Sequence, residues 1–130
     1  MATIKVIEEE KLMENAENLN KIAFERFTSM KKQFSFIGEV RGLGLSVGVD
    51  LVKDPLTKER NKEAAAKICY RAWEKGLLLA FFSNSVLRIQ PPLIITEEEF
   101  NKGIDIIEEC MSDLEKGLLS DDILKITKGW

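Results

Sequence analysis

The hydrophobic period of this chain changes along its length, and this change constrains the fold more than any other feature. Three segments, at about residues 7–32, 58–75 and 97–116, repeat apolar side chains every three or four positions, which is typical of amphipathic helices. Between them, residues 35–53 and 77–90 hold short alternating or apolar runs bounded by turn-forming residues, which is typical of strands. The order helix, two strands, helix, two strands, helix predicts an α+β fold.

We expect a small, mostly antiparallel sheet of three to four strands that is covered by helices on one face. The other face is then either solvated or pressed against something outside the chain. Residues 1–130 are predicted to form a single domain, because a chain of this length with 45% hydrophobic residues can bury one core. Residues 118–130 are expected to form a flexible, weakly helical tail with Trp130 frayed at its end.

Composition argues against several classes of partner. The 19 basic and 22 acidic residues give a net charge of -3 without a long basic block, so we expect no nucleic-acid partner. No apolar run approaches the ~20 residues that cross a bilayer, and the charged start is unlike a signal peptide. We therefore predict no membrane partner and a cytoplasmic location. Histidine is absent, and no metal site is predicted.

The two cysteines, Cys69 and Cys110, lie in helix-periodic segments, far from any C-x-x-C spacing. This placement favours buried, reduced thiols over a metal or redox role. Trp73 falls on the apolar stripe of the second predicted helix, so we expect it in the core.

The glycines of "VRGLGLSVG" resemble a dinucleotide-binding motif only superficially. Gly42, Gly44 and Gly48 are spaced G-x-G-x-x-x-G and lead into a strand, whereas a phosphate cradle needs the amino end of a helix. We predict a sharp turn between two strands, with close approach of a neighbouring group as the alternative. Arg41, just before the turn, is expected to be exposed or ion-paired.

Arg88 stands inside the strand-like run "SVLRIQPPLIIT". Strand alternation places Leu87 and Ile89 toward the helices, and Val86, Arg88 and Gln90 on the opposite face. Two interpretations of Arg88 stay open: a side chain pointing into water, or a fixed fork of donors for a carboxylate. The two prolines that follow lack amide donors, so strand pairing should end just after this arginine.

Several stretches together resemble one family. They are "VIEEEKLMENAENLN", "IGEVRGLGLSVGVDLV", "WEKGLLL" and "SVLRIQPPLIITEEEFNKGIDIIEE". In order and spacing they are similar to the carboxy-terminal small domain of class III pyridoxal-phosphate aminotransferases, which include the 4-aminobutyrate and ornithine aminotransferases. The similarity extends to about Gly117, and "VRGLGL" together with "LRIQPPLIIT" is its most specific part.

This resemblance implies that Arg88 binds the α-carboxylate of an amino-acid or keto-acid substrate. It implies an aminotransferase that moves an amino group from a donor such as 4-aminobutyrate to a 2-keto acid. No stretch matches the motif that carries the Schiff-base lysine, so the catalytic residues and the pyridoxal phosphate site are implied to lie in a preceding large domain. We therefore expect this excised domain to be inactive alone and the full-length enzyme to be a homodimer.

Two other functions remain open. Similar class III enzymes racemise amino acids with the same cofactor, and a small domain alone does not separate the two reactions. The chain could also be a free-standing, non-catalytic α+β binding module.

Overall fold

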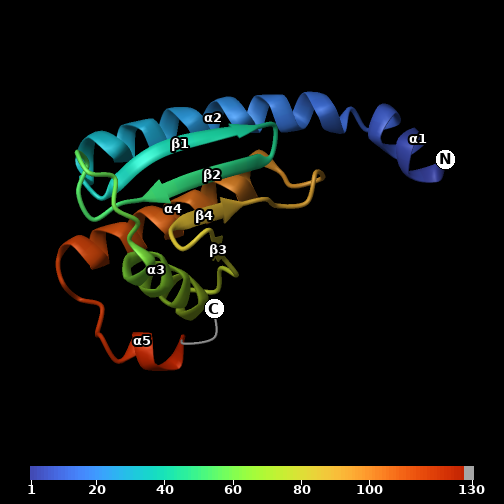
Figure 1. Cartoon of the computed structure of the whole chain (residues 1–130). Coiled ribbons are helices and arrows are strands. Elements are labelled where there is room, and N and C mark those ends of the chain that lie inside the picture. The colour runs from blue at the N-terminus through green and yellow to red at the C-terminus, as the bar shows by residue number, and fades with distance from the viewer. Residues whose placement is uncertain (128–130) are drawn as a thin grey trace.

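The structure is a computed structural model that describes residues 1–127. Its helices and strands are shown in Figure 1. In chain order they are α1 (Ala2–Glu9), α2 (Leu12–Gln33), β1 (Ile37–Leu43), β2 (Ser46–Leu51), α3 (Lys62–Glu74), β3 (Ala80–Phe82), β4 (Val86–Ile89), α4 (Glu97–Glu115) and α5 (Ile123–Ile126).

The four strands form one antiparallel sheet in the order β1-β2-β4-β3. Strands β1 and β2 form one hairpin, β3 and β4 form another, and β2 pairs with β4 to join the two hairpins in the middle of the sheet. This arrangement confirms the predicted α+β fold and its small antiparallel sheet.

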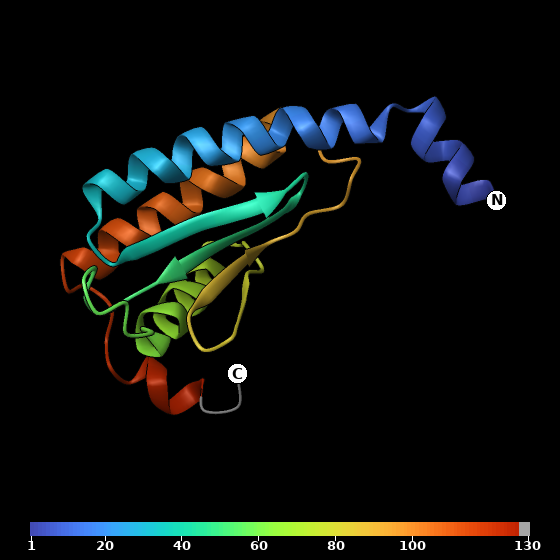
Figure 2. The same ribbon diagram turned by 45° about the horizontal axis from the view of Figure 1, so that its top comes forward.

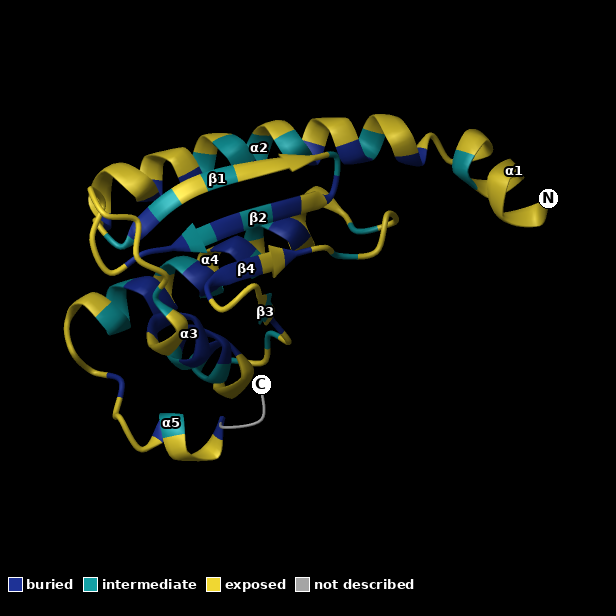
Figure 3. Cartoon of the chain, in the orientation of Figure 1, coloured by how far each residue is buried: buried dark blue, intermediate teal, exposed yellow. Residues whose placement is uncertain are grey.

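The core lies between one face of this sheet and helices α2, α3 and α4 (Figures 1 and 3). Its largest fully buried side chains come from all three helices and from the two central strands. They include Leu19, Phe27, Leu51, Ile68, Leu87, Ile104 and Met111. One face of the central strands β2 and β4 is buried against this shared core, and the opposite face of the sheet is left without a helical cover.

The first predicted helix is in fact two helices. We predicted one helix from Ile7, but Lys11 adopts a left-handed backbone conformation with φ of 52° that interrupts it. The buried stripe begins only at Leu12, whereas α1 has no buried residue. Helix α1 therefore projects beyond the sheet, as Figure 2 shows. Apolar residues do recur before Leu12, but none of the residues of α1 is buried in the described chain.

The starts of α3 and α4 follow from their capping residues. A capping box begins α4: Glu99 N donates to Thr96 Oγ1 over 3.2 Å, and Thr96 N donates to Glu99 Oε2 over 3.0 Å. Helix α3 begins later than predicted, because Lys58 has a φ of 55°. Asn61 caps it instead and accepts a hydrogen bond from Ala64 N over 3.0 Å.

Trp73 corrects another prediction. It is 58% exposed and not part of the core. It follows the buried Ala72 by one position, and one position turns a helical side chain by about 100°, away from the core. Its ring packs at the surface against Tyr70, with ring centroids 5.6 Å apart. Cys69 and Cys110, by contrast, are buried and free, as predicted.

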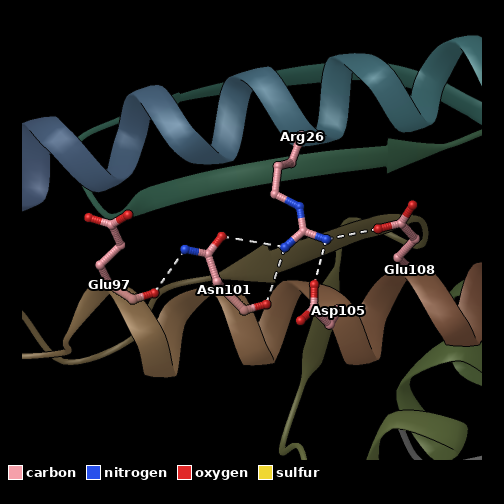
Figure 4. A network of polar contacts seen from close by, with 5 residues as sticks. All are labelled: Arg26, Glu97, Asn101, Asp105 and Glu108. Carbon is pink, nitrogen blue, oxygen red and sulfur yellow. Dashed lines mark hydrogen bonds and ion pairs between the residues drawn. The ribbon is translucent and has the colours of Figure 1, made fainter.

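Helices α2 and α4 are clamped together by one half-buried guanidinium (Figure 4). Arg26 Nη2 lies 2.7 Å from Asp105 Oδ1 and 2.8 Å from Glu108 Oε2. Its Nη1 donates to the backbone carbonyl of Asn101 over 3.3 Å. This network lies on the helical side of the molecule, away from the uncovered face of the sheet.

The segment after α4 contains one helical turn, α5, in which Ile123 is buried; Leu119, just before it, is also buried. The predicted tail thus contributes to the surface of the core through these two side chains. Trp130, predicted to be frayed, lies outside the described residues. Across residues 1–127, no helix combines the length and the apolar content that crossing a membrane requires.

Candidate functional site

Two arginines stand on the uncovered face of the sheet in one cross-strand row. Arg41 of β1 pairs with Gly48 of β2, Gly48 pairs with Arg88 of β4, and Arg88 pairs with Ala80 of β3. Residues paired in this way point their side chains to the same face. Gly48 and Ala80 are small, so both guanidinium groups are free of bulky direct neighbours.

Arg88 is exposed, although Leu87 and Ile89 on either side of it are buried. The buried neighbours and two paired strands therefore fix its backbone, while its side chain extends over the open face. Its Nε donates to Gln90 Oε1 over 2.5 Å, and its Cζ lies 5.8 Å from the centroid of the Phe82 ring. The structure thus places Arg88 on the face that strand alternation predicts.

Arg88 differs from other arginines of the chain in what it contacts. Arg26, Arg41 and Arg71 each have a carboxylate oxygen within 3.0 Å. Arg41, predicted to be exposed or ion-paired, is both, because it pairs with Glu39. Within residues 1–127, no carboxylate lies within ion-pair distance of Arg88, so its two terminal nitrogens are available to an external anion.

Val86 lies on the same face as Arg88, as strand alternation predicts, because it pairs with Asp50 and Phe82. Unlike Arg88, it is buried there. Its Cγ1 would lie only 3.1 Å from a Cβ added at Gly48. Val86 therefore occupies space that a side chain at position 48 would need. Gly48 allows this close approach of Val86 to the backbone of β2. Gly42 and Gly44 have φ values of 156° and 53°, which fits the predicted turn.

Two hollows meet at Arg88. The first has a volume of about 360 Å³ and is mainly apolar. It lies between α4 and the open end of the β3–β4 hairpin, where β3 begins and β4 ends. The second lies between the β1–β2 turn and the loop that follows β4. Both are lined by Arg88, Gln90 and Pro91. The strand end that carries the arginine therefore separates two concave surfaces.

Side-chain amides of α2 hold the loops around the second hollow. Asn15 Nδ2 donates to the carbonyls of Leu93 and Ile95 over 2.9 and 3.0 Å. Asn20 Nδ2 donates to the carbonyl of Gly44 over 2.7 Å. Because these bonds connect distant parts of the chain, α2 positions both the turn and the loop after Pro92. The sequence analysis did not identify either asparagine.

The described residues around Arg88 do not fit attachment of pyridoxal phosphate. That cofactor needs a lysine whose amine can be neutral, and neither hollow has a lysine in its lining. Elsewhere, a hydrogen bond to Glu59 raises the pKa of Lys53, and one to Glu109 raises the pKa of Lys75. These shifts favour the charged amine, which cannot attack a carbonyl. Among residues 1–127 there is also no acidic or cysteine cluster suited to a metal ion.

Sequence reasoning missed two contacts of Arg88. Gln90 is two residues along the same strand, a spacing that places both side chains on one face, so it could have been identified. Phe82 comes from the neighbouring strand, and its contact depends on the register of the β3–β4 hairpin. That register was not available from the spacing of the residues alone.

Comparison with known proteins identifies the family. The family model described as aminotransferase class-III matches residues 1–111. A leucine/methionine racemase of Thermococcus litoralis is 47% identical over the whole chain, which spans 29% of the racemase. A protein of Bacillus subtilis named "Probable 4-aminobutyrate aminotransferase" is 38% identical over 83% of the chain, which spans 25% of it.

A solved structure agrees with these relatives. An aminotransferase of Bacillus anthracis superposes with a TM-score of 0.77 at 30% identity, over 83% of this chain and 26% of the other. The chain therefore spans roughly a quarter of the length of the relatives it matches. The matched region contains the sheet, the two hollows and Arg88, and the chain belongs to the class III aminotransferase family.

Proposed function

We propose that this chain supplies the substrate-carboxylate site of a pyridoxal-phosphate enzyme, and that Arg88 binds the carboxylate of an amino-acid or keto-acid substrate. The observation that carries the proposal is a strand-anchored guanidinium, exposed on the uncovered face and without a carboxylate partner among the described residues. The Arg88 assignment rests on the "LRIQPPL" motif and on this geometry together.

The chemistry of arginine suits this role. A planar guanidinium presents parallel N–H donors that match the two oxygens of a carboxylate, and it stays charged at all physiological pH values. A charge-assisted hydrogen bond contributes about 1.5–3 kcal/mol net. This energy is enough to orient a substrate from one end while the reacting carbon is held elsewhere.

The remainder of the enzyme is part of the proposal. The relatives are three to four times longer than this chain, so a cofactor domain of the same polypeptide is proposed to carry the Schiff-base lysine and the phosphate site. The uncovered face of the sheet would then be turned toward that domain. We call this polypeptide the complete enzyme, and we propose that it is a cytoplasmic homodimer that needs no nucleic acid or membrane.

Two reactions are candidates for the complete enzyme. Transfer of an amino group to a 2-keto acid is the reaction predicted from the sequence. Racemisation of an amino acid is favoured by one observation, the 47% identity to the leucine/methionine racemase against 38% to the aminotransferase. On this difference we propose racemisation as the first candidate and transfer as the second.

One incubation separates the two reactions. The complete enzyme is given L-leucine alone, and optical rotation or chiral chromatography follows the appearance of the D form. Racemisation is supported if D-leucine forms without a keto acid. Conversion that occurs only after 2-oxoglutarate is added, with glutamate as a product, supports transfer instead.

The chain alone is proposed to be catalytically inactive. When it is mixed with pyridoxal phosphate, we expect only the weak absorbance that exposed lysines produce with the aldehyde. A stoichiometric adduct at a single lysine, mapped by borohydride reduction and mass spectrometry, would contradict this proposal and would favour a self-contained site.

A further inference from the structure

We infer that Gln90 and Phe82 are positioning residues that fix which edge of the Arg88 guanidinium is offered to the substrate. This inference rests on the proposed role of Arg88. It adds a geometric statement: the carboxylate is bound end-on, by the two terminal nitrogens, and not side-on through Nε.

The hydrogen bond to Gln90 carries the first step. A guanidinium has five N–H donors, and a carboxylate can bind either to Nη1 and Nη2 or to Nε and one Nη. In this structure Nε already donates to Gln90 Oε1 over 2.5 Å. The edge formed by Nε and one Nη is therefore occupied. A carboxylate that accepts two hydrogen bonds can then bind only to Nη1 and Nη2.

The amide of glutamine suits this task better than a carboxylate would. Its oxygen accepts the bond from Nε but carries no net charge, so Arg88 keeps its full positive charge for an anion. Arg41 provides the contrast on the same face, because Glu39 accepts from its Nη1 over 2.9 Å and neutralises it. Of these two neighbouring guanidinium groups, only Arg88 is oriented without being neutralised.

The prolines after Gln90 help to hold it in place. A residue that precedes proline is restricted to extended conformations, because the proline ring clashes with its backbone in the helical region. Gln90 is therefore kept extended, and its side chain stays on the face of Arg88, two positions away. Pro91 thus ends the strand pairing and also keeps the Gln90 side chain beside Arg88.

Phe82 restrains the guanidinium from the other side. It pairs with Val86, so it stands diagonally across the hairpin from Arg88, while Ala80 lies directly opposite. Its ring centroid is 5.8 Å from Arg88 Cζ, within the range of a cation–π contact. The small side chain of Ala80 leaves this diagonal approach open.

The test uses the complete enzyme and steady-state kinetics with its amino-acid substrate. Gln90→Leu removes the acceptor for Arg88 Nε and keeps a similar side-chain size. The guanidinium is then no longer held in one orientation, so we expect KM to rise about 5- to 20-fold with kcat little changed. Gln90→Glu keeps an acceptor oxygen but adds a competing charge, so its KM should rise further. Gln33→Leu, an exposed glutamine at the end of α2, is the matched control and should not change KM.

A spectroscopic measurement on the chain separates positioning from folding. The Nε–H proton of Arg88 should give a distinct, slowly exchanging signal in nitrogen–proton correlation spectra of the wild type. Gln90→Leu should lose this signal while the backbone amide spectrum is kept. An unchanged Nε–H signal in Gln90→Leu would overturn the inference.

The kinetic outcomes also distinguish this inference from the proposed function. If Arg88→Ala raises KM strongly while Gln90→Leu behaves like the wild type, Arg88 keeps its role and the positioning inference is wrong. If Arg88→Ala leaves KM unchanged, both fail. If Arg88→Ala and Gln90→Leu both raise KM and Gln33→Leu does not, the positioning inference is supported.

Discussion

Arg26 of α2 and Asp105 of α4 face each other across the helical layer, with 2.7 Å between Nη2 and Oδ1. The same guanidinium also contacts Glu108 and the Asn101 carbonyl, so one side chain links α2 to two turns of α4 (Figure 4). This clamp fixes the helices beneath the sheet on whose other face Arg88 stands.

The clamp predicts a measurable loss of stability. Arg26→Met keeps much of the aliphatic length but removes every polar contact, and we expect the free energy of unfolding to fall by about 1–2 kcal/mol, as for a half-buried charged network. Urea denaturation measures this loss. Lys21→Met is the control, because the exposed Lys21–Glu17 pair should contribute less than about 0.5 kcal/mol. Equal losses in both variants would show that the Arg26 network contributes no more to the free energy of unfolding than an exposed ion pair does.

The β1–β2 turn predicts unequal effects at two glycines. At Gly42 an added Cβ would overlap the Ser46 carbonyl oxygen, whereas at Gly44 the nearest atom, Ala16 Cβ, would lie at 3.7 Å. We expect Gly42→Ala to destabilise the fold by more than about 2 kcal/mol and Gly44→Ala by about 1 kcal/mol, the latter from its positive φ alone. Thermal denaturation followed by circular dichroism compares the two, and the reverse order would contradict this reading of the turn.

The capping box at α4 predicts a pH dependence. The Thr96 backbone N–H, and then its hydroxyl, donate to the Glu99 carboxylate and lower its pKa below the usual 4.5. Because the folded state holds this group at a depressed pKa, its contribution is present above about pH 4.5 and is lost as the pH falls through the folded pKa. We expect the stability difference between wild type and Glu99→Gln to shrink as the pH falls below about 4.5. A difference that grows toward acid would contradict the assignment.

The buried thiols predict low reactivity. Burial raises the pKa of Cys69 to about 12 and that of Cys110 to about 11, so the thiolate that reacts with alkylating reagents is scarce. We expect iodoacetamide at pH 8 to modify neither thiol in the native protein and both in guanidinium chloride. Mass spectrometry counts the modified sites, and rapid native labelling of either cysteine would show that it is accessible.

Local signals in the sequence were sufficient for most of the fold. The helical segments near residues 58–75 and 97–116, the turn at Gly42 and Gly44, and the end of strand pairing just after Arg88 were all predicted and are all present. Each of these depends on residues within a few positions of one another. Such signals do not need the tertiary structure in order to be read.

The features that the sequence did not predict depend on distant contacts. Trp73 fits an apolar helical stripe, but burial at its position requires a partner that the described chain does not place there. Val86 lies on the predicted strand face, but its burial there depends on the space that Gly48 leaves on the next strand. At the site, Arg88 could be identified from its motif, whereas the contact with Phe82 required the register of a hairpin.

The central claim is tested most directly by replacing Arg88 in the complete enzyme and measuring substrate binding. We expect Arg88→Ala to weaken the apparent affinity for the amino-acid substrate by about 10- to 100-fold, the loss of a charge-assisted bond, while the cofactor absorbance stays as in the wild type. Arg41→Ala, which removes the neighbouring guanidinium already paired with Glu39, should leave that affinity unchanged. An Arg88→Ala enzyme that binds its substrate as tightly as the wild type would contradict the role proposed for this arginine.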